Sequence, residues 1–262
     1  MTKEGYIQQQ KTLQNRLMKK YIGPVNRALR MQNAGYAQVV AEHGPETALR
    51  IIHGHMTINH AIGPIVSSLY KDAARMAEKK LKITKDAPVI NMFGFVQSVI
   101  SYFNKYLLEK VVIPISRTTQ DIIENLLKQA IREGWGVDKT VAKIKDPKIT
   151  SSRARTIVRT ESVRAMNYAQ LKAADNEKYE TEKQWIAVED KRTRYSHGHN
   201  GVDGERRDLY DPFSNGLLFP GDPDGDAEET INCRCTLGYF LKRTLEGDLV
   251  PKKINEHSAQ PV

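Results

Sequence analysis

Cysteine is nearly absent from this 262-residue sequence, which contains only Cys233 and Cys235. Two cysteines separated by one residue rarely form a structural disulfide, so the sequence excludes a disulfide-stapled fold and favours a reducing compartment. The first ten residues contain no apolar segment, and we expect no signal peptide there.

Long hydrophobic runs are also lacking. Residues 87–104 form an 18-residue stretch without a charge, close to the length of a membrane-spanning helix. The stretch contains Pro88, Gly94 and several polar residues, and its apolar residues recur at helical spacing. This pattern is typical of a helix packed on one side of a soluble core, so we expect no membrane contact.

Acidic residues are scarce in the first half of the chain. Residues 1–117 contain 17 Lys and Arg against 7 Asp and Glu, whereas residues 118–262 contain 23 against 24. A basic excess attracts phosphate or an acidic protein partner, although lysines also simply solubilise helix surfaces. Candidate residues for non-specific contact with double-stranded DNA are Lys19, Lys20, Lys79 and Lys80.

Helix start and stop signals predict a helical first half. Proline fits the first turn of a helix, so a helix should end and another begin at Gly23-Pro24, Gly44-Pro45 and Gly63-Pro64. Further signals predict three more helices: one from about residue 118 to Gly134, one from Val137 to Lys145, and one that is capped by Ser151 and Ser152 and runs to about Asn176.

The periodicity becomes strand-like after Glu182. Residues 183–188 and 231–240 are predicted strands, and residues 190–230, rich in Gly, Asp, Asn and Pro, are a long irregular loop. The sequence therefore predicts an α+β protein. Its expected parts are an all-helical basic region (1–115), a small α+β domain with the long loop (116–241) and a polar tail (242–262).

Residues typical of functional motifs gather in the second half of the chain. The motifs are an "RTE" helix with Arg159 and Glu161, a strand with Trp185, a "D-x-R-T" turn with Asp190 and Arg192 that ends in His197, a "DG" at Asp203 and Gly204, and an "NCRC" with Cys233, Arg234 and Cys235. This ordered set, over about residues 118–240, resembles the phage head morphogenesis family of Mu F-like and SPP1 gp7-like minor head proteins.

The resemblance implies a minor head (capsid) protein of a tailed bacteriophage, located in the virion near the portal vertex and in the host cytoplasm during assembly. Its implied partners are the portal protein, the major capsid or scaffold proteins, and packaged or ejected DNA. The basic first half independently suits a position next to dense phosphate. We expect a structural protein and no enzymatic activity.

One interpretation of the two cysteines is that they bind zinc. Many members of the family carry a Cys-x-x-Cys in the "D-x-R-T" turn and a His before Cys-Arg-Cys, which is similar to a zinc knuckle. This sequence departs from that pattern, because Arg194 and His197 stand at the turn and Glu228-Glu229-Thr230 stands where the His is expected. Three candidate ligands remain, His197, Cys233 and Cys235, with Asp190 or Glu229 as a fourth.

The favoured interpretation needs no metal. Cys233 and Cys235 would be small buried residues, and Arg234 would be buried and pair with Glu161 or Asp190 to hold the long loop. Arg234→Ala would then leave a buried carboxylate unpaired and lower the free energy of unfolding by about 2–4 kcal/mol.

Two short runs of residues bear on enzymatic alternatives. The run His197-Gly198-His199-Asn200 is a poor match to a metal-dependent HNH-type nuclease. Arg159 and Glu161 together with Glu228 and Glu229 are distantly similar to the arginine and glutamate motifs of ADP-ribosyltransferases, which occur fused to Mu F-like domains.

Overall fold

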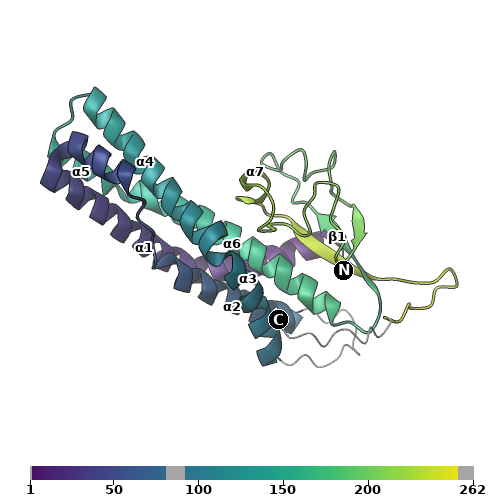
Figure 1. The fold of residues 1–262 in the computed structure, drawn as a ribbon. Helices are drawn as coiled ribbons and strands as arrows, with labels where there is room; N and C mark the ends of the chain where they lie inside the picture. Colours follow the sequence, from purple (N-terminus) through teal and green to yellow (C-terminus); the bar gives the residue numbers. More distant parts are fainter. Residues whose placement is uncertain (1, 81–91, 253–262) are drawn as a thin grey trace.

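The computed structural model describes residues 2–80 and 92–252 and has an elongated outline (Figure 1). A helical arm projects from one side, and the sheet and irregular loops lie at the other end (Figure 1). The elements are α1 (Lys3–Gly54), α2 (Ile62–Lys80), α3 (Met92–Tyr106), a π-helical turn (Leu107–Val112), α4 (Ile113–Arg132), α5 (Val137–Ile144), α6 (Pro147–Asp175), β1 (Thr181–Ile186), β2 (Arg206–Asp208), α7 (Ala227–Thr230) and β3 (Thr236–Leu241). This confirms the predicted fold class.

The first helix is longer than predicted. α1 continues through Gly23-Pro24, so the predicted end there is wrong. The buried residues Leu17, Tyr21, Val25 and Leu29 recur at helical spacing on both sides of the proline, and this continuous packing outweighs the one backbone hydrogen bond that proline removes. Gly44-Pro45 behaves as predicted, since Gly44 breaks the helix with φ 73°. At Gly63-Pro64 only the predicted start is confirmed, because Pro64 lies in the first turn of α2 but the preceding helix already ends at Gly54.

Three further predicted boundaries are wrong. α4 begins at Ile113, with Pro114 in its first turn, instead of at about residue 118. α6 begins at Pro147, and the Asp146 side chain caps it by accepting from the Lys148 N–H at 2.9 Å, so Ser151 and Ser152 lie inside the helix. The second predicted strand begins at Thr236 instead of residue 231, because Asn232 has φ 60° and its N–H donates to Thr160 Oγ1 on α6. Cys233 and Cys235 therefore precede β3.

One cluster of buried apolar residues runs through the sheet end of the molecule. It joins Leu17 of α1, Leu69 of α2, Phe103 of α3 and Met166 of α6 to Trp185 of β1. A smaller cluster, which includes Tyr36, Ile123 and Ile144, holds α1, α4 and α5 together in the arm. The predicted domain boundary near residue 115 falls in the first turn of α4.

The sheet is antiparallel with strand order β2-β1-β3, and Trp185 of β1 pairs with Leu237 of β3. The open edge of β3 is covered by the start of α1. Tyr6 Oη donates to the Tyr239 carbonyl and accepts from the Tyr239 N–H, both at 3.3 Å. Lys3 pairs with Asp203 at 2.6 Å, so the first turns of α1 are tied to the sheet.

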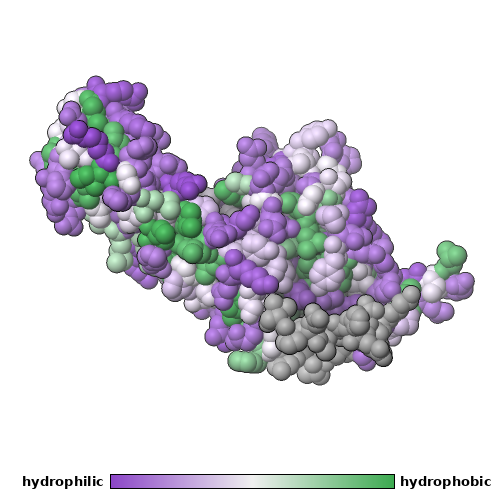
Figure 2. All heavy atoms as spheres, viewed as in Figure 1, coloured by the Kyte–Doolittle hydropathy of each residue, from purple (hydrophilic) through white to green (hydrophobic). Residues whose placement is uncertain are grey.

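Hydrophilic residues cover most of the face seen in Figure 2, and hydrophobic residues gather midway along the arm and at its free end. Within residues 2–80 and 92–252, no helix has the length and apolar content needed to cross a bilayer. Residues 92–104 of the uncharged stretch lie in α3, and residues 87–91 lie outside the described residues.

Candidate functional site

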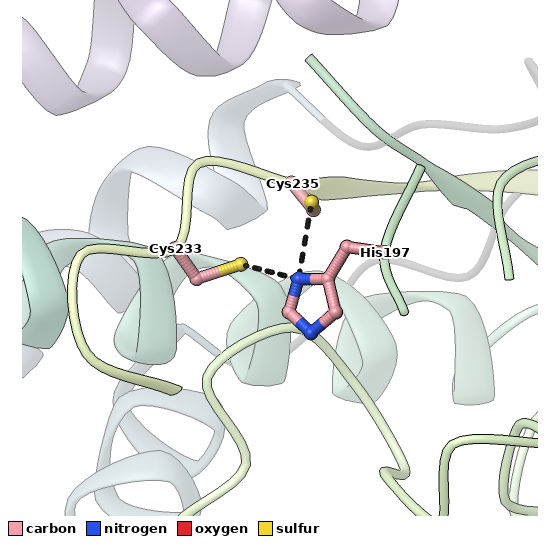
Figure 3. Close-up of side chains that lie close together, drawn as sticks. All are labelled: His197, Cys233 and Cys235. Carbon is pink, nitrogen blue, oxygen red and sulfur yellow. Dashed lines mark hydrogen bonds between the residues drawn. The ribbon is translucent and has the colours of Figure 1, made fainter. Parts of the chain in front are cut away.

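The structure brings His197, Cys233 and Cys235 together at a buried site (Figure 3). His197 Nδ1 lies 3.6 Å from Cys233 Sγ and 3.7 Å from Cys235 Sγ. The histidine comes from the turn after β1, and the two cysteines come from the segment before β3. The site therefore joins the two ends of the long irregular loop.

Local backbone geometry aims His197 inward. The Asp190 side chain accepts from the Arg192 N–H at 2.8 Å, and Thr193 Oγ1 donates to the Val188 carbonyl, so the segment that precedes His197 is held in place. At Gly201 a Cβ would lie 2.2 Å from the Ser196 carbonyl oxygen, so only glycine permits the chain to fold back here. The imidazole then packs edge-on against the Trp185 ring, with centroids 4.9 Å apart.

Glu229 of α7 faces the other side of the imidazole. Its Oε2 lies 2.6 Å from His197 Nε2, and Ser196 Oγ donates to both carboxylate oxygens at 3.0 Å. A carboxylate this close to the distal nitrogen of a histidine favours the tautomer that carries its proton on that nitrogen. Glu229 therefore acts on the site through His197 and does not face the sulfur atoms.

The two thiols differ in proton affinity. A hydrogen bond from Cys235, together with the nearby His197, holds the pKa of Cys233 well below its usual range. The same contact with Cys233, and burial, raise the pKa of Cys235 well above its usual range. These shifts favour a thiolate at Cys233 that accepts a hydrogen bond from the Cys235 thiol, and thiolate is the form that binds metal.

The three donors fit a zinc ion. Imidazole nitrogen and two thiolates are ligands that Zn²⁺ prefers, and a carboxylate behind the histidine is the usual outer partner. Neither predicted fourth ligand faces the donors, because Asp190 pairs with Arg234 and Glu229 contacts Nε2. Beside the donors lies a cavity of about 10 Å³, which is room for one water. Bound zinc would crosslink the turn to the segment before β3.

We expect the purified, reduced protein to bind one Co²⁺ per chain with an absorption band from sulfur-to-cobalt charge transfer, and to release it to zinc. Glu229→Gln should weaken this binding by about 10–100-fold, because the outer carboxylate no longer orients His197. Glu228→Gln, a neighbouring exposed carboxylate, is the matched control. If the wild-type protein showed no such band, the two cysteines would not bind metal, and their role would be the hydrogen bond between thiol and thiolate.

Arg234 pairs with Asp190, one of its two predicted partners. Arg234 Nη2 donates to Asp190 Oδ1 at 2.7 Å and Nη1 donates to Oδ2. The hydrogen bond from Arg234 lowers the pKa of Asp190 to about 2. The expected burial is wrong, however, since the side chains of Arg234 and Asp190 are 17% and 37% exposed. Water screens this pair, so it stabilises the fold less than a buried pair would.

The buried ion pair instead joins Glu161 to Arg164. Arg164 Nη1 donates to Glu161 Oε2 at 3.0 Å, Arg164 Nε donates to the Gly221 carbonyl at 2.8 Å, and Tyr70 Oη donates to Glu161. Sequence reasoning missed this role of Arg164, although the i,i+3 spacing of Glu161 and Arg164 was a usable signal. Gly221 has φ 86°, and a Cβ there would lie 3.0 Å from Arg164 Cα, so the loop approaches α6 only through glycine.

Lys183 is a second buried charge that sequence reasoning missed. Its side chain lies inside the sheet end, where Nζ donates to the Leu218 carbonyl at 2.7 Å and lies 4.9 Å from the centre of the Phe213 ring. Burial lowers the pKa of Lys183 to about 7. The alternation of β1 was the available signal, because Lys183 shares a face with the buried Thr181 and Trp185.

The other motif residues have structural contacts. Asp203 Oδ1 accepts from the Ala187 N–H at 2.8 Å, and the Gly204 N–H donates to the Trp185 carbonyl at 2.9 Å, so the "DG" ends β1. Arg159 Nη1 donates to Asn232 Oδ1 at 3.3 Å. Arg192 is exposed.

The residues of the two enzymatic alternatives are not gathered into one site. His197 faces the cysteines while His199 is exposed, and Glu161 is buried in its ion pair while Glu228 is exposed.

The candidate DNA-contact lysines are far apart in the chain. Lys19 and Lys20 are exposed on α1, and Lys20 pairs with Asp72 at 2.5 Å. Lys79 and Lys80 lie at the end of α2, and their side chains fall outside the described residues.

Comparison with known proteins gives two matches. Residues 121–238 match a family model described as phage Mu protein F like protein. A 144-residue stretch, 53% of this chain, is 28% identical to the uncharacterized protein YqbB of Bacillus subtilis (strain 168). The alignment spans 47% of that relative, about half of its length. No solved structure is significantly similar to the chain.

Proposed function

Because residues 121–238 match the family model of phage Mu protein F like protein, we propose that the chain is a minor head protein of a tailed bacteriophage and acts in head morphogenesis. The observation that carries this proposal is that the motifs resembling the head morphogenesis family lie within the matched residues and contact one another. Arg234 binds Asp190, Arg159 binds Asn232, and His197 contacts both cysteines.

The proposed role is structural and not catalytic. The motif side chains bind each other or the backbone, and so they fasten the loop between β1 and β3 to α6. Incubation with NAD, or with plasmid DNA and a divalent metal, should give no turnover, and a Glu229→Ala variant should be indistinguishable from wild type. Turnover that this variant abolished would overturn the structural role.

We place the protein inside the head at the portal vertex, with the portal protein and the major capsid or scaffold proteins as partners. The helical arm supports such contacts, because it extends away from the sheet end and hydrophobic residues gather at its free end (Figures 1 and 2). Ile51 of α1 and Ile131 in the last turn of α4 are partly exposed. Mass spectrometry of purified heads should detect the chain, and imaging should show its density against the portal. Absence from assembled heads would overturn the proposal.

We also propose that α1 contacts DNA. Residues 5–41 contain six Lys and Arg and no Asp or Glu, and Arg16 and Lys19 are exposed. The double variant Arg16→Glu, Lys19→Glu of the full chain should bind double-stranded DNA more weakly. The slope of log K against log salt should decrease in magnitude by about 2, because the variant forms fewer phosphate contacts and binding therefore releases fewer counterions. Fluorescence anisotropy with labelled DNA measures both quantities. Unchanged affinity would make α1 a protein-docking surface.

A further inference from the structure

Five arginines from three parts of the chain meet beside the His–Cys site, although the second half of the sequence is nearly neutral. We name this set the arginine surface: Arg155 and Arg159 on α6, Arg192 and Arg194 in the turn after β1, and Arg234 before β3. Burial and then the charges of Arg192, Arg234 and Arg155 lower the pKa of Arg159, as expected for like charges held near one another.

The fold holds these arginines in place. Arg159 Nη1 donates to Asn232 Oδ1 at 3.3 Å, and Arg194 Nη2 donates to the Ile231 carbonyl at 2.5 Å. The turn at residues 231–232 thus fixes an arginine on each side of it. Arg192, Arg194 and Arg234 also line a single cavity next to His197.

Carboxylates do not neutralise the arginine surface. Asp190 binds Arg234 and lies 3.8 Å from Arg192, while Glu229 contacts His197 and Ser196. Among residues 2–80 and 92–252, no carboxylate forms an ion pair with Arg155, Arg159 or Arg194. The run of residues 191–202 contains no Asp or Glu. Four arginines are therefore left with little or no counter-charge.

We infer that the arginine surface binds phosphates of double-stranded DNA without reading its sequence. The inference rests on the proposed function, in which the chain meets DNA in the head. One guanidinium group can donate two parallel hydrogen bonds to a phosphate, and several arginines on one surface can bind successive phosphates of a DNA backbone.

The neighbouring exposed residues favour DNA over an acidic protein. They are polar apart from Ile231 and Tyr195, and they include Lys191, His199 and Asn232. A protein–protein interface has an apolar centre, whereas a protein–DNA interface is polar and strongly positive.

The test is the double variant Arg155→Glu, Arg192→Glu of the full chain. Both side chains are exposed, so the fold should keep its thermal unfolding temperature. In fluorescence anisotropy at low salt, we expect the affinity for labelled double-stranded DNA to fall about tenfold or more and the salt slope to fall by about 2. DNA of a different sequence should bind with the same affinity.

Two matched variants carry the same change of charge. Lys143→Glu, Lys145→Glu alters exposed lysines at α5 in the arm and should leave binding near wild type. Arg16→Glu, Lys19→Glu reports on α1 alone. The inference would be overturned if the α5 variant and the arginine-surface variant lost DNA affinity equally, or if the arginine-surface variant bound DNA like wild type. Either result would leave the α1 proposal standing.

Incorporation into heads separates the inference from the proposed function. Suppose that the wild-type protein is found in heads and that the arginine-surface variant binds DNA normally but is no longer incorporated. This result would assign the surface to an acidic protein partner and overturn the DNA inference. If instead the wild-type protein is absent from heads but its DNA affinity depends on Arg155 and Arg192, only the proposed function is overturned.

Discussion

Lys183→Met should remove about 2 kcal/mol of the rise in unfolding free energy that the wild-type protein shows between about pH 7 and pH 9. Burial lowers the pKa of Lys183 from 10.5 to about 7 in the folded protein. Between these two values the unfolded chain binds more protons than the folded chain, so stability increases with pH. Below about pH 7 both states are protonated and the full cost of the buried charge remains.

Denaturant unfolding of wild type and Lys183→Met across this pH range gives the measurement. Taking the difference between the two proteins cancels other groups that titrate in both, such as Cys233. Lys191→Met, at an exposed position in the turn after β1, is the control and should follow wild type. If the plots of unfolding free energy against pH were parallel for wild type and Lys183→Met, the pKa of Lys183 would not be lowered in the folded protein.

Glu161→Ala should lower the free energy of unfolding by about 3–5 kcal/mol, because it leaves the buried Arg164 charge without its partner. The Tyr70 hydroxyl also loses its acceptor. Arg234→Ala should cost about 1 kcal/mol or less, since its pair with Asp190 is partly exposed. This replaces the larger loss expected for Arg234 from the sequence.

Chemical denaturation of the two variants beside wild type tests the ranking, and Glu161→Gln, which keeps the side-chain volume and a polar acceptor, should fall between them. Equal losses for Glu161→Ala and Arg234→Ala would contradict the assignment of the buried pair to Glu161 and Arg164.

The sequence predicted features that depend on local signals. The end of α4 before Gly134 and the short helix from Val137 follow from glycine and helix periodicity, and both are confirmed. The convergence of His197, Cys233 and Cys235 was accessible because the motif residues are few and chemically distinctive. The helix through Pro24 was not, since packing along Tyr21 and Val25 decides it and no local signal reports that packing.

The arginine surface could not be predicted for a similar reason. Arg155 and Arg192 are far apart in the chain, and the second half contains nearly equal numbers of basic and acidic residues, so its net charge does not reveal a local cluster of arginines. Likewise, lysine is normally a surface residue, so Lys183 gave no indication of burial apart from the alternation of its strand. Tertiary packing fixes both features.

The contact between Tyr6 and Tyr239 joins the first turns of α1 to β3. The two residues are 233 positions apart, so the ribosome releases Tyr6 long before its partner strand exists. Helical pairs with near neighbours, such as α4 and α5, form quickly, whereas contacts of long sequence separation form late. We therefore expect the first turns to dock onto β3 late in folding, and until they do the backbone of β3 would offer a free pairing edge to other copies.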